Sequence, residues 1–134
     1  MHYSGRICRE DCKKMKIEIV NIVDRGVANK ERLWLKVIAT TNLNYFIVFD
    51  TTYTSQNAIS NLQRHAYWFK PKEVRAGDSV VLYTKSGTPS EQKNQDGSTT
   101  HFMFWGLEKT VWNNSGDCAV LFEVNSWQTS KYSD

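Results

Sequence analysis

The sequence predicts an all-β fold, a β-sandwich of about seven to nine short strands. Three observations support this prediction. Short apolar runs recur at intervals of roughly 10 to 20 residues, separated by polar stretches rich in Gly, Asn, Asp or Pro. Within several runs apolar and polar residues alternate, which is the period of a half-buried strand. No segment longer than about 10 residues keeps a helical period; the nearest candidate is the segment 59–66.

Length and composition indicate one domain in a reducing compartment. The 134 residues suffice to bury a core without disulfide bonds, and the net charge of +3 permits but does not require acidic partners. The three cysteines lack the spacing of a disulfide framework, and no apolar run approaches the roughly 20 residues that span a membrane. We therefore expect a soluble cytoplasmic protein, with a flexible N-terminal tail at 1–14, a sandwich domain at 15–126 and a C-terminal tail at 127–134.

The first half of the domain contains three expected strands. The segment Met15–Asp24 alternates at Ile17 and Ile19 and then changes phase, which indicates a strand with either a bulge or a part covered on both faces. The segments Leu33–Thr40 and Tyr45–Thr52 are predicted to form a hairpin, because only a short polar link joins them. In this hairpin one face carries Leu33, Leu35, Val37 and Ala39, and the opposing residues are Tyr45, Ile47 and Phe49.

A short aromatic strand opens the second half. It covers Tyr67–Phe69, and Pro71 limits its continuation because proline cannot donate a hydrogen bond to a ladder. The segment Arg75–Asp78 contains turn residues and leads into a further strand. In that strand Val80 and Leu82 are expected to point inward.

The rest of the domain is predicted to contain one long loop and two strands. The segment Ser86–Thr100 is almost purely polar, so we expect a mobile loop without regular structure. The strands are expected at 101–106 and 118–124. Cys118 begins the second of them and is interpreted as a small buried residue.

A polar cluster precedes the last strand. The residues Asn113–Asp117 are small and polar, and they are typical of a tight reversal of the chain. Gly116 can adopt a positive φ there, and the Asn and Asp side chains can cap backbone groups. Trp112, directly before this turn, is expected to fill the core or its rim.

Catalytic and metal-binding patterns are weak. His65 and His101 have no nucleophile or carboxylate placed beside them by spacing, and Ser115 lacks the two flanking glycines of a nucleophile elbow. Cys8 and Cys12 form one pair, whereas a structural zinc site generally has four ligands in two pairs. We therefore expect a protein that is not an enzyme and that holds no metal and no cofactor.

The segment 64–75 carries the strongest functional signal, because it mixes cations with aromatic residues. Cations neutralise phosphates and aromatic faces stack on bases, so the mixture is typical of nucleic-acid binding. The alternative interpretation is structural: alternate aromatic residues of a strand enter the core while the cations stay in water. The candidate binding residues of this segment are Arg64, Trp68, Lys70, Lys72 and Arg75.

Together, these features resemble the lamin-tail domain, a family of immunoglobulin-like β-sandwiches. The resemblance covers Leu33 to Val124 and is most specific from Tyr67 onward. The motifs that carry it are the Ala76–Gly77 turn, a strand reaching Gly87, the pair Trp105–Gly106 and the turn Asn114–Asp117. The sequence departs from the family pattern in its longer segment Thr51–His65.

The resemblance implies an immunoglobulin-like, non-catalytic interaction module that binds a partner protein. Exposed aromatic residues such as Trp68, Trp105 or Trp127 would serve as anchors, since binding hot spots favour Trp and Tyr. The alternative function is DNA binding through the cations of segment 64–75. An exposed edge strand could also pair with a second copy to give a homodimer, although the sequence does not say which strand forms the edge.

Overall fold

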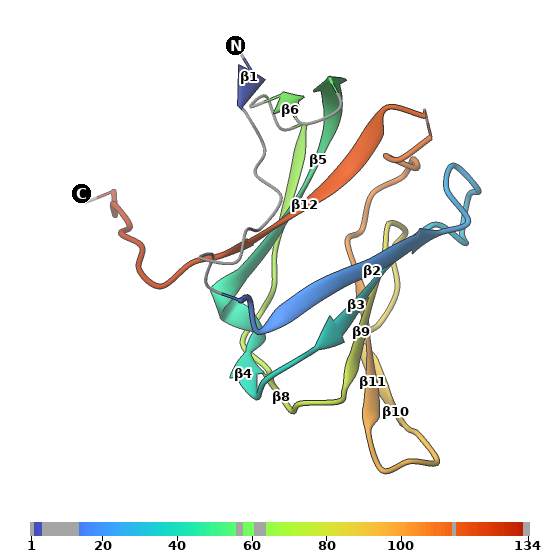
Figure 1. Cartoon of the computed structure of the whole chain (residues 1–134), viewed down its shortest axis with the longest axis vertical. Coiled ribbons are helices and arrows are strands. Elements are labelled where there is room, and N and C mark those ends of the chain that lie inside the picture. The colour runs from blue at the N-terminus through green and yellow to red at the C-terminus, as the bar shows by residue number, and fades with distance from the viewer. Residues whose placement is uncertain (1, 4–13, 56–57, 61–63, 114, 133–134) are drawn as a thin grey trace.

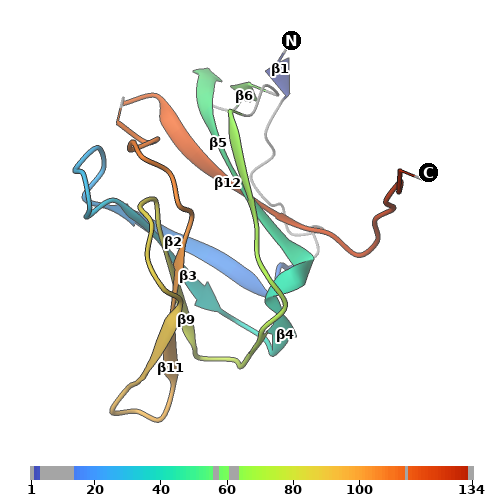
Figure 2. The same cartoon turned by 180° about the vertical axis from the view of Figure 1, so that it is seen from behind.

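The fold consists almost entirely of β-strands, which a computed structural model places in two five-stranded sheets and a short two-stranded ladder (Figures 1 and 2). The structure describes residues 2–3, 14–55, 58–60, 64–113 and 115–132. One sheet contains β1 (His2–Tyr3), β6 (Ala58–Ser60), β5 (Phe46–Ser55), β12 (Asp117–Glu123) and β7 (His65–Trp68). The other runs in the order β10 (Ser90–Lys93), β11 (Thr99–Phe104), β9 (Ser79–Tyr83), β3 (Arg32–Val37) and β2 (Ile17–Val23). The short ladder joins β4 (Thr41–Asn42) to β8 (Glu73–Val74).

The all-β prediction is confirmed. Among the described residues, eight strands have four residues or more, in agreement with the expected number. Most neighbouring strands are antiparallel, but β11 pairs with β9 in parallel, so the chain crosses over between them. Of the two explanations for the change of phase in β2, the bulge is the one observed, because the register with β3 shifts between Ile19 and Asn21.

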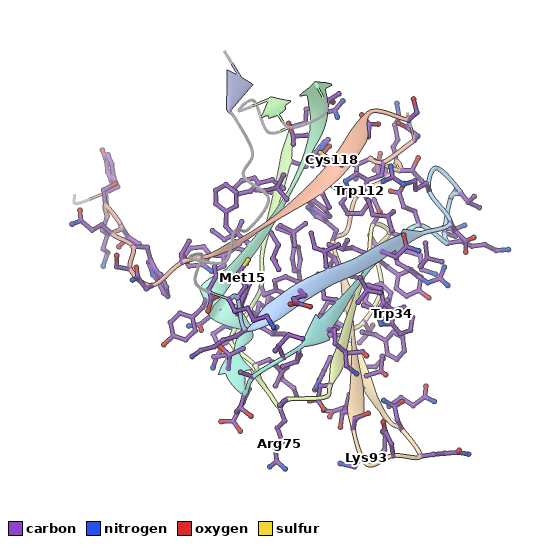
Figure 3. All side chains as sticks on the ribbon, in the orientation of Figure 1. Met15, Trp34, Arg75, Lys93, Trp112 and Cys118 are labelled. Carbon is purple, nitrogen blue, oxygen red and sulfur yellow. The ribbon has the colours of Figure 1, made fainter. Side chains whose placement is uncertain are left out.

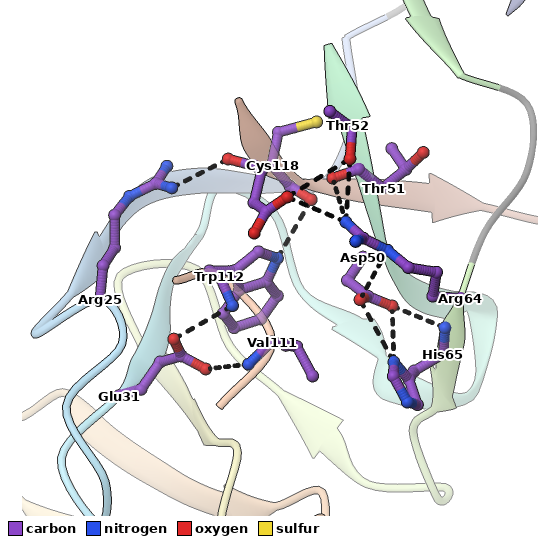
Figure 4. A network of polar contacts seen from close by, with 11 residues as sticks. Arg25, Glu31, Asp50, Thr51, Thr52, Arg64, His65, Val111, Trp112 and Cys118 are labelled. Carbon is purple, nitrogen blue, oxygen red and sulfur yellow. Dashed lines mark hydrogen bonds and ion pairs between the residues drawn. The ribbon is translucent and has the colours of Figure 1, made fainter. Parts of the chain in front are cut away.

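The hydrophobic core lies between the two sheets and follows the alternation of their strands. Its fully buried members include Ile17, Leu33, Leu35, Phe46, Val48 and Trp112. The two residues expected to point inward from β9, Val80 and Leu82, are fully buried as well. Trp112 lies in the core as expected, and its indole Nε1 donates to the carbonyl of Cys118 at 3.0 Å (Figures 3 and 4).

The predicted hairpin between Leu33–Thr40 and Tyr45–Thr52 is wrong, because β3 and β5 belong to different sheets. The residues between them form β4 and the short 3-10 helix η1 (Leu43–Tyr45), which carry the chain across the sandwich. Asn42 fixes this passage, since its Oδ1 accepts from the backbone N–H of Asn44 at 3.1 Å and of Lys72 at 3.0 Å. A link short enough for a hairpin therefore carries the chain from one sheet to the other.

The change of sheet also corrects which residues of β5 face the core. Phe46 and Val48 are fully buried, and they alternate with Ile47 and Phe49, which are only half-buried on the outer side. Tyr45 is exposed. The predicted core-facing residues of β5 are therefore wrong by one position. The run 45–49 is entirely apolar, so it contains no polar residue that would mark the outer face of the strand.

The segment Ser86–Thr100, predicted as a mobile loop, contains regular structure that the sequence does not indicate. Strand β10 pairs in antiparallel register with β11, and together they form a hairpin that extends beyond the rest of the sandwich (Figure 1). Its turn is closed by a bond from the N–H of Asn94 to the carbonyl of Ser98 at 2.8 Å, and Gly97 takes a φ of +89°. All four side chains of β10 are exposed, so the strand shows no apolar alternation in the sequence.

The turn before β12 is confirmed, but Gly116 does not use a positive φ there. The described glycines in the left-handed region are Gly26, Gly77, Gly97 and Gly106. A Cβ on Gly116 would lie 3.3 Å from Cγ2 of Thr52, so close packing against β5 explains the small residue. Asn114 lies outside the described residues.

A buried carboxylate connects three loops at one end of the sandwich (Figure 4). Oε1 of Glu31 accepts from the backbone N–H of Val111 at 2.8 Å and from the hydroxyl of Thr84 at 2.7 Å. Oε2 accepts from the N–H of Gly26 at 2.8 Å and of Trp112 at 3.1 Å. Each oxygen therefore has two donors, which compensates the cost of burying the charge.

A second buried carboxylate attaches the β10–β11 hairpin to the turn before β9. Asp78 accepts from the N–H of Arg75 and of Thr99, both at 3.0 Å, and Nε2 of His101 lies 3.0 Å from its Oδ2. Burial alone would raise the pKa of Asp78. The hydrogen bond and charge of His101 and the two backbone bonds outweigh burial, so this pKa lies below its ordinary value.

Glu31→Gln should lower the free energy of unfolding by about 3 kcal/mol, because the NH2 group that replaces one carboxylate oxygen cannot accept and leaves the donors facing that oxygen unpaired. Urea denaturation at pH 7 measures the change. Glu108→Gln, at an exposed loop position, is the matched control and should change stability by less than about 0.5 kcal/mol. Equal effects of the two substitutions would contradict the role of Glu31.

Asp78→Asn should destabilise the protein by about 2 kcal/mol at pH 7, and the difference from wild type should shrink below about pH 4. The sign follows from the lowered pKa: the ionised carboxyl stabilises the fold above its unfolded pKa, and this contribution is lost as the pH falls through the folded pKa. Urea denaturation at pH 7, 5 and 3 tests this. A difference that stays constant down to pH 3 would contradict it.

Candidate protein-interaction face

Strand β7 sends its aromatic residues to both faces of the sheet. Tyr67 points into the core, where its ring lies 4.9 Å from that of Phe69, and Phe69 is buried. Trp68 points to the outer face, and its Nε1 donates to the carbonyl of Asn44 at 2.7 Å. The structural interpretation of this segment thus applies to Tyr67 and Phe69, while Trp68 remains available to a ligand.

Arg64, the first cation of the segment, is bound by carboxylates (Figure 4). Its guanidinium Nη2 lies 3.0 Å from Oδ1 of Asp117, and its Nε lies 3.6 Å from Oδ2 of Asp50. The same Nη2 donates to Oγ1 of Thr52 at 2.9 Å. The positive charge of Arg64 is therefore compensated within the protein, which weakens its attraction for a phosphate.

The other expected cations differ from Arg64 in their surroundings. Lys72 forms an ion pair with Glu91 at 3.0 Å, while Lys70 and Arg75 are exposed. Arg75 lies in the turn before β9, at the opposite end of the molecule from the start of β12, where Arg64 is bound (Figure 3). The structure does not gather these cations into one patch.

Trp105 is not an exposed anchor. It is half-buried, and its ring lies 5.7 Å from that of Trp112 and 5.9 Å from that of Tyr67, between centroids. It therefore packs against the core from the segment that follows β11. The expectation that Trp105 is exposed is wrong, whereas Trp68 and Trp127 are exposed as expected.

Apolar and aromatic side chains cover the outer side of β7, β5 and β12. The register places Trp68 beside Ile47 and Ile47 beside Phe122, so the three lie in one row across the sheet. We call this surface the aromatic face and define it by Tyr45, Ile47, Phe49, Trp68, Val120, Phe122 and Trp127. Four of its rings remain 40–45% exposed: Tyr45, Trp68, Phe122 and Trp127.

The rings of the aromatic face support one another. Trp127 lies between two of them, with its centroid 5.2 Å from that of Trp68 and 6.1 Å from that of Tyr45, both in edge-to-face geometry. Phe49 and Phe122 form a further edge-to-face pair at 5.1 Å. These contacts restrict the rings before any partner binds, which lowers the entropy cost of association.

A cleft of about 780 Å³ adjoins the aromatic face at Tyr45. Its apolar lining includes Met15 and Leu121, and Lys14 and Lys16 also line it. Both lysines are exposed and outnumber Glu123, which lines the same cleft, so the charge beside the apolar surface is positive on balance. Sequence reasoning missed this juxtaposition because Lys14–Lys16 and Tyr45 are far apart along the chain.

Among the described residues, His65 and Asp50 form a close pair that Cys118 does not join. Nδ1 of His65 lies 3.2 Å from both carboxylate oxygens of Asp50, but the alternation of β12 places Cys118 on the opposite side of the sheet. Burial is the main cause that raises the pKa of the Cys118 thiol, so its nucleophilic thiolate is disfavoured. Among the residues that the structure describes, no three His, Cys, Asp or Glu side chains group as ligands for a metal ion.

Two buried carboxylates in this region could not be anticipated. Asp50 and Glu31 both lie within or beside apolar strands, and their donors come from distant segments. The aromatic face did leave a signal: the uninterrupted apolar run 45–49 indicates a strand with apolar residues on both faces. Cys8 and Cys12, the weak zinc candidates, lie outside the described residues.

None of the described residues forms a helix with the length and apolar character that crossing a lipid bilayer takes. Comparison with protein-family models, with curated proteins and with solved structures finds no match to this chain.

Proposed function

We propose that this chain is a non-catalytic, immunoglobulin-like interaction module that binds a partner protein through the aromatic face. The observation that carries the proposal is the group of four rings, each 40–45% exposed, on the outer side of β7, β5 and β12. Contiguous apolar surface of this kind marks interaction sites, and Trp and Tyr are enriched at their energetic centres. Trp68 and Trp127 are the expected anchors.

The resemblance to the lamin-tail domain supports the same proposal. Its Ala76–Gly77 turn is present, with Gly77 at a φ of +95° that favours glycine. The passage of the chain from β3 to β5 in the facing sheet is compatible with an immunoglobulin-like sandwich. Binding by such a module requires a rigid surface rather than bond chemistry.

The surroundings of the aromatic face suggest the chemistry of the partner. The cleft beside Tyr45 offers apolar contact at Met15 and Leu121, and Lys14 and Lys16 supply positive charge at the same place. A partner segment with apolar or aromatic side chains followed by acidic residues would match both features. Such a segment would place its apolar part on the rings and its carboxylates near the lysines.

DNA binding through segment 64–75 is the alternative function. Lys70 and Arg75 are exposed and support it, but Arg64 and Lys72 are already paired with carboxylates. Of the three aromatic residues Tyr67–Phe69, Trp68 alone is exposed and could stack on a base.

Trp68→Ala should weaken binding of a partner peptide about thirtyfold, the effect of a hot-spot residue worth roughly 2 kcal/mol. Peptides selected from a random displayed library on the wild-type protein provide the probe. Fluorescence anisotropy of the selected peptides with each variant gives the Kd.

Tyr132→Ala is the matched control, since Tyr132 is the most exposed aromatic residue described and lies outside the aromatic face. It should leave the Kd unchanged. Selected peptides that bind wild type and Trp68→Ala equally well would place the binding site elsewhere and overturn the proposal. The selected sequences should also be enriched in apolar and acidic residues.

The DNA alternative predicts micromolar binding of labelled DNA that weakens about tenfold or more between 50 and 200 mM salt. We expect no such binding, because two of the four cations are neutralised within the protein. Fluorescence anisotropy with single- and double-stranded DNA measures it. Salt-sensitive binding that disappears in Lys70→Glu/Arg75→Glu would favour the alternative over the protein-binding proposal.

A further inference from the structure

Strand β10 leaves one side of its backbone without a neighbouring strand in the described part of the chain. The bond from the N–H of Asn94 to the carbonyl of Ser98 shows that residue 94 points its backbone groups toward β11. The N–H of Thr99 bonds to Asp78, on the far side of β11, so residue 93, which faces it, is not hydrogen-bonded to β11. Backbone groups alternate along a strand, so those of Glu91 and Lys93 point outward from the edge.

Glu91 and Lys93 also share one face of the strand, because they are two residues apart. Both side chains are exposed. In an antiparallel pair with a second copy, outward-pointing residues must face one another to exchange backbone hydrogen bonds. Three symmetric registers satisfy this rule: Glu91 opposite Glu91, Lys93 opposite Lys93, or Glu91 opposite Lys93.

Charge selects one of these registers. The first two place like charges directly opposite each other, which is destabilising. The third, with its two-fold axis at Gln92, places Glu91 of each copy opposite Lys93 of the other and lets both pairs exchange backbone hydrogen bonds. The two Gln92 side chains then meet on the other face, where one amide can donate to the other.

We propose that β10 is a self-complementary edge through which two copies of this chain join their sheets in antiparallel register about Gln92. The hairpin that carries β10 extends beyond the rest of the sandwich, which leaves room for a second copy (Figure 1). Lys93 lies at the far end of this hairpin (Figure 3). Glu91 keeps its bond to Lys72 at 3.0 Å, since a carboxylate can accept from both lysines.

The edge of β12 is less suited to this role. It is bound to the segments that flank β2. Nη1 of Arg25, after β2, donates to the carbonyl of Asp117 at 2.8 Å, and the N–H of Lys16, directly before β2, donates to Oε1 of Glu123 at 3.4 Å. Pro89, directly before β10, has no N–H and so limits the new ladder to the strand itself. A short interface of this size is expected to be weak.

Sedimentation velocity of the full chain across a concentration series tests the proposal. We expect the wild type to pass from monomer to dimer between about 10 µM and 1 mM. Glu91→Lys and Lys93→Glu should each weaken the dimer about tenfold or more, because like charges then face each other in both pairs. The double variant Glu91→Lys/Lys93→Glu should restore the wild-type dimer, since every pair is again opposite in charge.

A mixture of the two single variants is the sharpest part of the test. Only the mixed dimer has opposite charges in both pairs, so dimer should form on mixing although neither variant dimerises alone. The double variant Glu108→Lys/Lys109→Glu makes the same charge changes on an exposed loop and should leave the dimer unchanged. Circular dichroism of each variant confirms that it is folded.

The proposal is overturned if the wild type stays monomeric at 1 mM, or if neither the double exchange nor mixing restores the dimer. Dimerisation that survives both single exchanges but disappears in Trp68→Ala would assign self-association to the aromatic face instead. Because the aromatic face and β10 lie on different sheets, failure of this proposal leaves the proposed partner binding intact.

Discussion

The buried carboxylate of Glu31 is the constraint on which one end of the sandwich depends. Its two oxygens accept from the loop after β2, from the end of β9 and from the segment that carries Trp112 into the core. Those three segments are not joined to one another by strand pairing. Their hydrogen bonds to the carboxylate of Glu31 hold them together instead. Trp112, the largest fully buried side chain, is positioned through its own N–H by this contact.

The aromatic face is a consequence of how β5 is used. This strand needs Phe46 and Val48 for the core, yet it also carries Ile47 and Phe49 on its outer side, and β7 and β12 add Trp68 and Phe122 beside them. A sheet with apolar residues on both faces normally has both faces covered. Within the described part of the chain, Trp127 covers only some of the outer side, which is the physical basis of the proposed partner surface.

The sequence predicted the strands whose apolar residues alternate and failed where alternation is absent. Leu33, Val80 and Trp112 lie in the core as expected, and β2 has its bulge. Strand β10 was missed because both of its faces are exposed, so its sequence has no apolar alternation. The β3–β5 hairpin was wrong because a short link between two strands can either pair them or carry the chain to the other sheet. Of the expected site residues, Trp68 is exposed and Trp105 is not, a difference set by long-range packing.

The parallel pairing of β11 with β9 also has a kinetic meaning. Parallel neighbours cannot be joined by a tight turn, so the chain between β9 and β11 must return along the length of the ladder, and it forms β10 on the way. The contacts of Glu31 with Val111 and Trp112 likewise join residues 80 and 81 positions apart. Non-local contacts form only after the loop-closure entropy has been lost, so we expect this protein to fold in milliseconds to seconds rather than microseconds.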